Sequence, residues 1–179
     1  MTQTVYELNP VEAITASAVG EPGHRVFYIQ ARTLDAIVTL VAEKEQVQLL
    51  AHGIQQFLAE LDQKFPQEDE GESVDPLDLE LRGPFEPNFR VAQMGLGYDA
   101  ENDRVVLMAH ELVAEGADPE SASIARFWAT RAQMKAMAEH ALDVAARGRP
   151  LCPLCGRPED REGHFCPKRN GHNKMLVTS

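Results

Sequence analysis

Residues 43–61 read EKEQVQLLAHGIQQFLAEL and residues 130–148 read TRAQMKAMAEHALDVAARG. The two segments align without gaps at an offset of 87 residues. In both, apolar residues recur at i, i+3, i+4, i+7, i+10 and i+11, which is the stripe of a helix lying on a core. Thr130 with Gln133 fits a capping box, and Gly148 stands where a helix should end. We therefore predict two amphipathic helices that belong to two copies of one unit.

Three segments of strand character precede each predicted helix. They are residues 13–20, 24–32 and 35–43 before the first helix, and residues 89–99, 104–114 and 123–130 before the second. The short connections between them predict antiparallel hairpins. The expected fold is α+β, an internally duplicated βββα unit whose two helices pack on one joined sheet or on two sheets. The alternative is chance similarity, because all helix stripes share this spacing.

The predicted α+β domain spans residues 1–148, with halves at 1–65 and 89–148, and a tail follows at 149–179. Between the halves, residues 66–88 hold four prolines and eight acidic residues against one arginine. This composition predicts a solvated, partly disordered connector.

Charge and cysteine usage exclude several classes of protein. The chain has a net charge of −11, and because residues 147–179 carry +4, residues 1–146 carry −15. A body this acidic repels phosphate backbones, so nucleic acid is a disfavoured partner. The sequence shows neither a signal peptide nor an apolar run that could span a membrane, and its odd number of cysteines does not suggest a disulfide framework. We expect a reducing cytoplasm.

All three cysteines lie in the segment CPLCGRPEDREGHFCPKRNGH, residues 152–172. Zinc prefers four tetrahedral nitrogen or sulfur ligands, and Cys-x-x-Cys offers it two thiolates from one turn. The segment predicts one structural Zn²⁺ per chain, which would replace the apolar core that a short tail lacks. The predicted ligands are Cys152, Cys155, Cys166 and His164, with His172 as the alternative fourth ligand. A thioredoxin-type redox pair, free thiols and a catalytic zinc are the competing interpretations.

Four segments carry a resemblance to a known family: residues 20–32, 43–47, 89–99 and 148–172. In these the chain resembles an uncharacterised family of bacterial proteins of about this length, known only as a domain of unknown function. The resemblance implies no activity. It implies gene neighbours that are histidine-phosphatase-like and lipid-kinase-like, and therefore a shared pathway without a named reaction.

The body of the chain offers one candidate ligand cleft. The segment GEPGHRVFYIQAR, residues 20–32, places polar residues around an apolar strand. The candidate cleft residues are His24, Arg25, Tyr28 and Gln30. A strand at a sheet edge, whose polar residues block aggregation, explains the same pattern. His52 and His140 lie outside the helix stripes and are expected at the surface.

The sequence favours a non-catalytic, zinc-stabilised cytoplasmic protein that binds another protein, with the tail as a docking module. Of Phe127 and Trp128, one should face the core and the other the opposite sheet surface, where an exposed aromatic would indicate docking. The alternative is an enzyme or small-ligand-binding protein that acts on a phosphorylated metabolite in a cleft between the two repeats. A nucleic-acid-binding zinc knuckle is disfavoured, since Phe165 is the tail's one aromatic residue.

Overall fold

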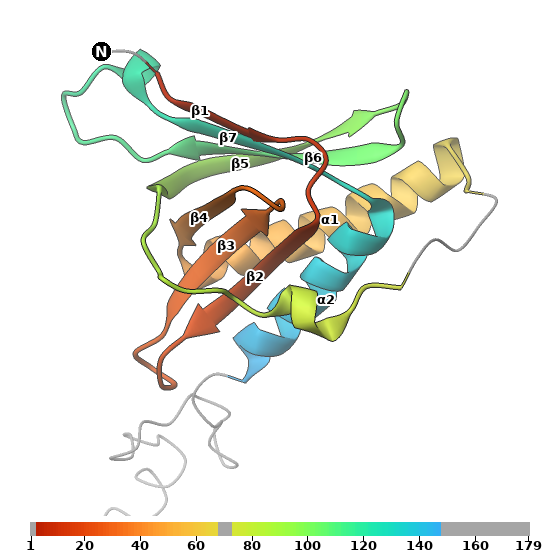
Figure 1. Cartoon of the computed structure of the whole chain (residues 1–179), viewed down its shortest axis with the longest axis horizontal. Coiled ribbons are helices and arrows are strands. Elements are labelled where there is room, and N and C mark those ends of the chain that lie inside the picture. The colour runs from red at the N-terminus through yellow and green to blue at the C-terminus, as the bar shows by residue number, and fades with distance from the viewer. Residues whose placement is uncertain (1–2, 68–72, 148–179) are drawn as a thin grey trace, which may run out of the picture.

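The computed structural model describes residues 3–67 and 73–147 (Figure 1). Within these residues the chain forms one seven-stranded sheet and two α-helices. The strands are β1 (Val5–Leu8), β2 (Ala13–Val19), β3 (Val26–Arg32), β4 (Ile37–Ala42), β5 (Phe89–Asp99), β6 (Arg104–Glu111) and β7 (Ile124–Ala129). The helices are α1 (Lys44–Lys64) and α2 (Arg131–Ala146), and short 3₁₀ turns lie at Pro76–Leu79 and Pro119–Ser121. The expected α+β class is confirmed.

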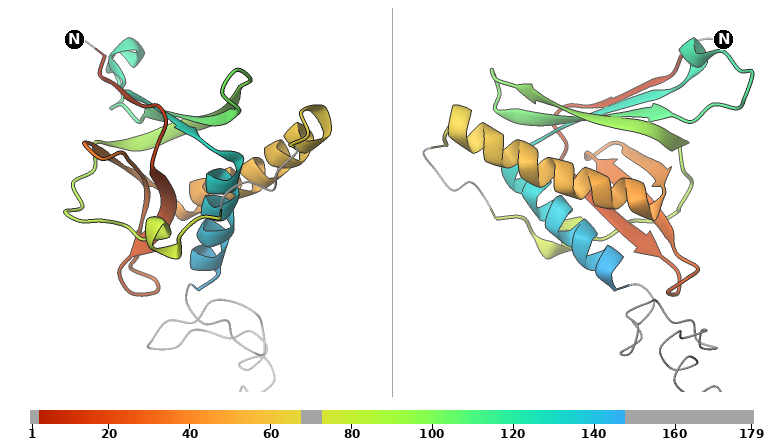
Figure 2. Two further views of the ribbon diagram at one scale, coloured as in Figure 1. Left: turned by 45° about the vertical axis from the view of Figure 1, so that its right-hand side comes forward. Right: turned by 180° about the vertical axis from the view of Figure 1, so that it is seen from behind.

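The strands run in the order β1-β7-β6-β5-β4-β3-β2. Strands β2, β3 and β4 form one antiparallel meander and β5, β6 and β7 form another, and a helix follows each. Parallel pairing of β4 with β5 joins the meanders into one sheet through two residue pairs, Leu40 with Phe89 and Val41 with Arg90. This narrow junction lets the two meanders turn relative to each other, as Figures 1 and 2 show.

Both helices begin where the sequence predicts. The side-chain oxygen of Gln46 accepts a hydrogen bond from the Glu43 backbone N–H at 2.8 Å. Gln133 does the same for Thr130 at 2.8 Å, and the Thr130 hydroxyl accepts from the Gln133 N–H at 3.0 Å. Each cap satisfies backbone donors that the first turn of a helix leaves unpaired. The two helix starts are thus set by local chemistry.

The helices pack in the angle between the two meanders and share one core with them (Figure 2). Each predicted apolar stripe is buried except for Phe57, which is half-buried against the core. From the sheet, Ile29, Leu40, Leu107 and Phe127 are fully buried. Burial of each such side chain stabilises the fold by roughly 1.5–3 kcal/mol. Neither described helix is long and apolar enough to cross a membrane.

Strand β1 is absent from the sequence-based prediction. It pairs in parallel with β7, Val5 lying opposite Ile124 and Leu8 opposite Phe127. Parallel strands need a long crossover, so nothing near β1 in the sequence signals its partner.

Most of residues 75–88 are exposed, as expected for a solvated connector, but the segment also makes specific contacts with the sheet that the sequence did not predict. The Thr15 hydroxyl donates to the Leu79 carbonyl at 2.6 Å, and Arg32 forms an ion pair with Asp78 at 2.5 Å. Asn88 donates to the Thr39 carbonyl at 2.7 Å and accepts from its N–H at 2.9 Å. The segment therefore covers the side of β2 and β3 that faces away from the core.

Candidate functional site

The four residues of the predicted cleft do not line one cavity. Gln30 is buried, and its amide donates to the Arg82 carbonyl at 2.9 Å and accepts from the Arg82 N–H at 2.8 Å. The Tyr28 ring stacks on Phe85, with centroids 5.6 Å apart. Both side chains therefore hold the connector on the sheet. The edge-strand interpretation is also wrong, because β3 lies between β2 and β4.

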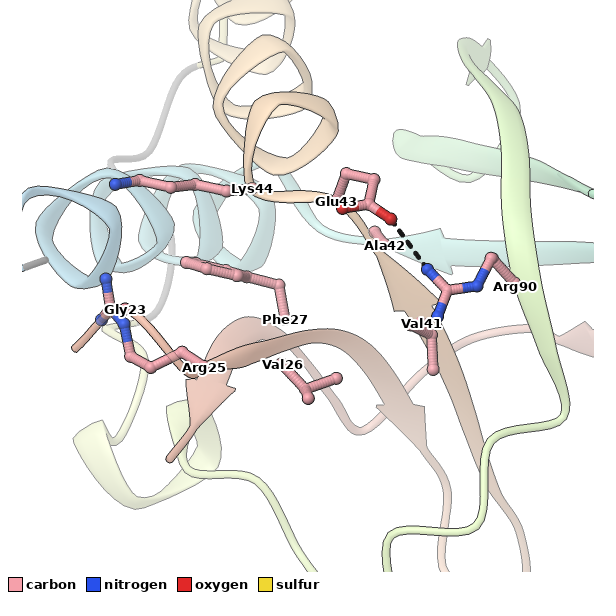
Figure 3. Close-up of a pocket in the computed structure, with 9 residues that line it drawn as sticks. All are labelled: Gly23, Arg25, Val26, Phe27, Val41, Ala42, Glu43, Lys44 and Arg90. Atoms are coloured by element: carbon pink, nitrogen blue, oxygen red, sulfur yellow. Dashed lines mark hydrogen bonds and ion pairs between the residues drawn. The ribbon is translucent and has the colours of Figure 1, made fainter. Parts of the chain in front are cut away.

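Arg25 directly precedes β3 and contacts α2 on the other side of the sheet. Its Nη1 donates to the Val144 carbonyl in the last turn of α2 at 2.8 Å, and its guanidinium lies 5.2 Å from the Phe27 ring centroid. His24 is exposed in the β2–β3 turn, where its N–H donates to the Glu21 carbonyl at 2.9 Å. Of the four predicted residues, Arg25 alone lines the cavity drawn in Figure 3.

The surface of β1, β7, β6 and β5 that faces away from the helices, here called the outer face, is covered by no described element (Figures 1 and 2). Phe127 is fully buried in the core, so strand alternation places Trp128 on the outer face, where it is half-buried. The expectation that these two aromatic residues divide between the two surfaces is confirmed. The apolar members of the outer face are Val5, Gly95, Gly97, Val106, Met108, Ile124 and Trp128.

Polar residues interrupt these apolar side chains: Arg126, paired with Glu7, lies opposite Met108 and between Trp128 and Ile124 on β7, and His110 lies opposite Ile124. Val106 lies directly opposite Trp128 on the neighbouring strand. The Met108 methyl group crosses two glycines, lying 3.6 Å from the position a Cβ would take at Gly97 and 3.9 Å from that at Gly95. The outer face thus has a methionine over two glycines of β5, and a tryptophan of β7 beside Val106.

A second cluster surrounds Arg131 at the start of α2. Its Nε donates to Asp103 at 3.0 Å and its Nη1 to Asp62 at 3.0 Å, while its Nη2 donates to the Phe65 carbonyl at 2.7 Å and the Tyr98 hydroxyl at 3.2 Å. These contacts, here called the Arg131 cluster, tie the end of α1 and the β5–β6 turn to α2. Sequence reasoning missed the cluster, because its members are scattered and follow no periodicity.

Asp103 is held ionised within the Arg131 cluster. Partial burial acts to raise the pKa of Asp103, but hydrogen bonds from Gln67, Tyr98 and Arg131 outweigh it and hold that pKa below its ordinary value. The cluster therefore depends on a carboxylate that acid would neutralise.

His140 is half-buried, so its expected place at the surface is wrong. Its Nε2 lies 3.3 Å from the Ser17 hydroxyl of β2. Burial, followed by the charge of Arg147, lowers the pKa of His140. A Ser–His pair can support nucleophilic catalysis only with oxyanion donors and a substrate cleft. Neither side chain lines the cavity of Figure 3 or the grooves beside Arg131.

The predicted zinc ligands Cys152, Cys155, His164 and Cys166, and the alternative His172, lie outside the described residues. Among residues 3–67 and 73–147, no group of three or more His, Cys, Asp or Glu side chains is placed to hold a metal ion.

A family model described as "Protein of unknown function (DUF3090)" matches residues 6–166. The chain belongs to this family. The DUF3090 match extends from β1 through α2 to Cys166, and it agrees with the resemblance to a domain of unknown function noted above. Neither the curated proteins nor the solved structures contain a match to the chain. Membership in the DUF3090 family assigns no activity.

Proposed function

We propose that this protein is a zinc-stabilised, non-catalytic adaptor that binds another protein through the outer face. The observation that carries the proposal is the position of Trp128, Met108 and Ile124 on a sheet surface that no described element covers. Aromatic residues and methionine are enriched in protein interfaces. The partner would present a complementary apolar surface.

The composition of β6 supports this proposal. An antiparallel strand with one face in water ordinarily alternates apolar and polar residues, whereas a strand covered on both faces is a continuous apolar run. Residues 105–109 read VVLMA, with Val105, Leu107 and Ala109 in the core and Val106 and Met108 on the outer face. The middle of β6 thus has the composition of a strand that is covered on both sides, although Arg104 and His110 near its ends are polar.

Two outer-face variants test the proposal, Met108→Glu and Ile124→Asp, each adding one carboxylate to the outer face. Leu34→Glu is the matched control, because Leu34 is 86% exposed in the β3–β4 turn. A partner captured from the native host should bind the wild type and the control but not the two variants. With the purified partner, fluorescence of Trp128, the chain's one tryptophan, should shift to the blue. Equal capture by all four proteins would refute the outer-face site.

We further propose that the protein is cytoplasmic and that its tail is a docking module whose fold is stabilised by zinc. Cys152, Cys155, Cys166 and His164 would bind one Zn²⁺, with His172 as the alternative fourth ligand. The tail's basic residues would add contacts to the partner; they include Arg157, Arg161, Lys168 and Arg169.

Metal analysis of the purified full chain tests the zinc site. One zinc per chain is expected in the wild type and in His172→Ala, and none in Cys152→Ser or His164→Ala. If zinc is retained in His164→Ala but lost from His172→Ala, the fourth ligand is His172. Metal-free wild-type protein, freshly purified, would refute the site.

We also propose that the body arose from a duplicated βββα unit. The 87-residue offset that relates the helix segments also relates the bounds of β4 and β7. The amides of the two cap glutamines make matching bonds, Gln46 to the Val91 carbonyl at 3.2 Å and Gln133 to the Glu12 carbonyl at 3.0 Å. Aligned sequences of the family should retain both cap glutamines with their stripes, and loss of the stripe similarity in most members would argue for chance.

A further inference from the structure

A cavity of about 310 Å³ lies where β3, β4, β5 and the start of α1 meet (Figure 3). Its lining residues are Gly23, Arg25, Val26, Phe27, Val41, Ala42, Glu43, Lys44 and Arg90. The volume is in the range of small-molecule sites. The cavity draws on both meanders, since Arg90 comes from β5 and the other strand residues from the first meander.

The charge of the cavity is opposite to that of the protein. Arg25, Lys44 and Arg90 supply three positive charges and Glu43 one negative charge, which leaves a net charge of +2. The whole chain carries −11. Three cations gathered around one cavity in so acidic a protein make a local site for an anion.

The three cations retain capacity for a ligand. Arg90 bonds Glu43 at 2.9 Å, but half of the Arg90 side chain is exposed. Arg25 donates to the Val144 carbonyl at 2.8 Å and has further N–H groups, while Lys44 has no hydrogen-bond or ion-pair partner among the described residues. Figure 3 shows Arg25 and Lys44 on one side of the cavity, with the Phe27 ring between them, and Arg90 across from them.

The position of Lys44 conflicts with helix stability. Lys44 is the first residue of the 21-residue α1, where the helix dipole favours acidic side chains and disfavours cations. Residues that go against local helix or strand preferences, without stabilising the fold in another way, are expected mainly at functional sites. A bound anion would explain a lysine at this position. The backbone N–H groups at the start of a helix also attract anions and would add to the binding.

We infer that this cavity binds a small molecule that carries a phosphate monoester on an apolar or aromatic body. A phosphate monoester is close to a dianion at neutral pH and so matches the net charge of +2. Guanidinium groups donate in pairs to phosphate oxygens, and an ammonium adds a point charge. Phe27, Val26 and Val41 supply apolar surface for the rest of the ligand. The inference rests on different residues from the proposed docking surface and does not depend on it.

Calorimetric titration of the full chain, as purified, at low salt tests the inference. The probes are phenyl phosphate and inorganic phosphate, with succinate as a dicarboxylate of similar charge. We expect phenyl phosphate to bind more tightly than either of the others. Lys44→Gln should weaken the binding of phenyl phosphate about tenfold or more, as expected for the loss of one hydrogen bond between charged groups. Failure of the wild type to bind phenyl phosphate, or tighter binding of succinate, would overturn the ligand class.

Two matched variants show where the anion binds. Lys64→Gln removes a lysine from the last turn of α1 and should leave the affinity unchanged. Lys168→Gln removes a cation from the basic tail and should also leave it unchanged. The site is refuted if Lys44→Gln binds as tightly as Lys64→Gln, or if Lys168→Gln weakens binding as much as Lys44→Gln.

Discussion

Replacement of Arg131 by methionine should be among the most destabilising single changes in the described part of the chain. The Arg131 side chain is 7% exposed and makes hydrogen bonds to four different residues, Asp62, Asp103, Phe65 and Tyr98. Methionine keeps most of the apolar volume and removes the charge and all donors.

The size of the expected stability loss follows from the charged groups that remain after Arg131 is replaced. Loss of one partner from a buried ion pair costs roughly 3–5 kcal/mol, because the other charge stays desolvated. Here the two carboxylates are partly rehydrated, since the side chains of Asp62 and Asp103 are 67% and 39% exposed. The lower end of the range applies, so Arg131→Met should lower the free energy of unfolding by about 3 kcal/mol. For a chain of this size that corresponds to a drop in Tm of roughly 6–12 °C.

Urea unfolding followed by circular dichroism measures the loss, with Arg126→Met as the matched control. Arg126 pairs with Glu7 at 2.9 Å on the exposed sheet surface, and an exposed pair contributes less than about 1 kcal/mol. Acid provides a further check. The folded state lowers the pKa of Asp103. The contribution of Asp103 to the free energy of unfolding is therefore complete above the pKa of the unfolded state, near 3.8. This contribution is lost as the pH falls through the lower pKa of the folded state. A loss for Arg131→Met no larger than that for Arg126→Met would refute the reasoning.

Three further outcomes are expected. Gly53→Ala in α1 should raise the free energy of unfolding by about 0.5–1 kcal/mol in urea titrations, because a Cβ there meets nothing within 4 Å and alanine is the better helix former. His140→Gln should reduce the loss of thermal stability between pH 7.5 and 5.5: the folded state lowers the pKa of His140, so the unfolded wild type takes up a proton first, at about pH 6.5. The proposed zinc site predicts that a metal chelator should increase proteolysis after Arg147 while the circular dichroism of the body stays unchanged; equal cleavage with and without the chelator would contradict it.

The parts of the fold that local chemistry determines were predictable, and the parts that depend on distant partners were not. The six strands from β2 to β7 and both helices followed from periodicity, turn residues and the cap at Thr130. Strand β1 and the seating of the connector depend on partners far away in the sequence, such as Leu79 on Thr15. The outer face was foreseeable from the adjacent aromatic residues at 127 and 128. The cavity around Lys44 was not, since only the folded chain brings it to Arg90.

The pairing of β1 with β7 has a consequence for the order in which the molecule is made. Val5 meets Ile124 only after more than a hundred intervening residues have left the ribosome, although domains begin to fold from the N-terminal end during synthesis. Closing so long a loop is entropically unfavourable until the second meander is in place to receive the strand. Strand β1 is therefore synthesised before its partner β7 and stays unpaired until the second meander has formed.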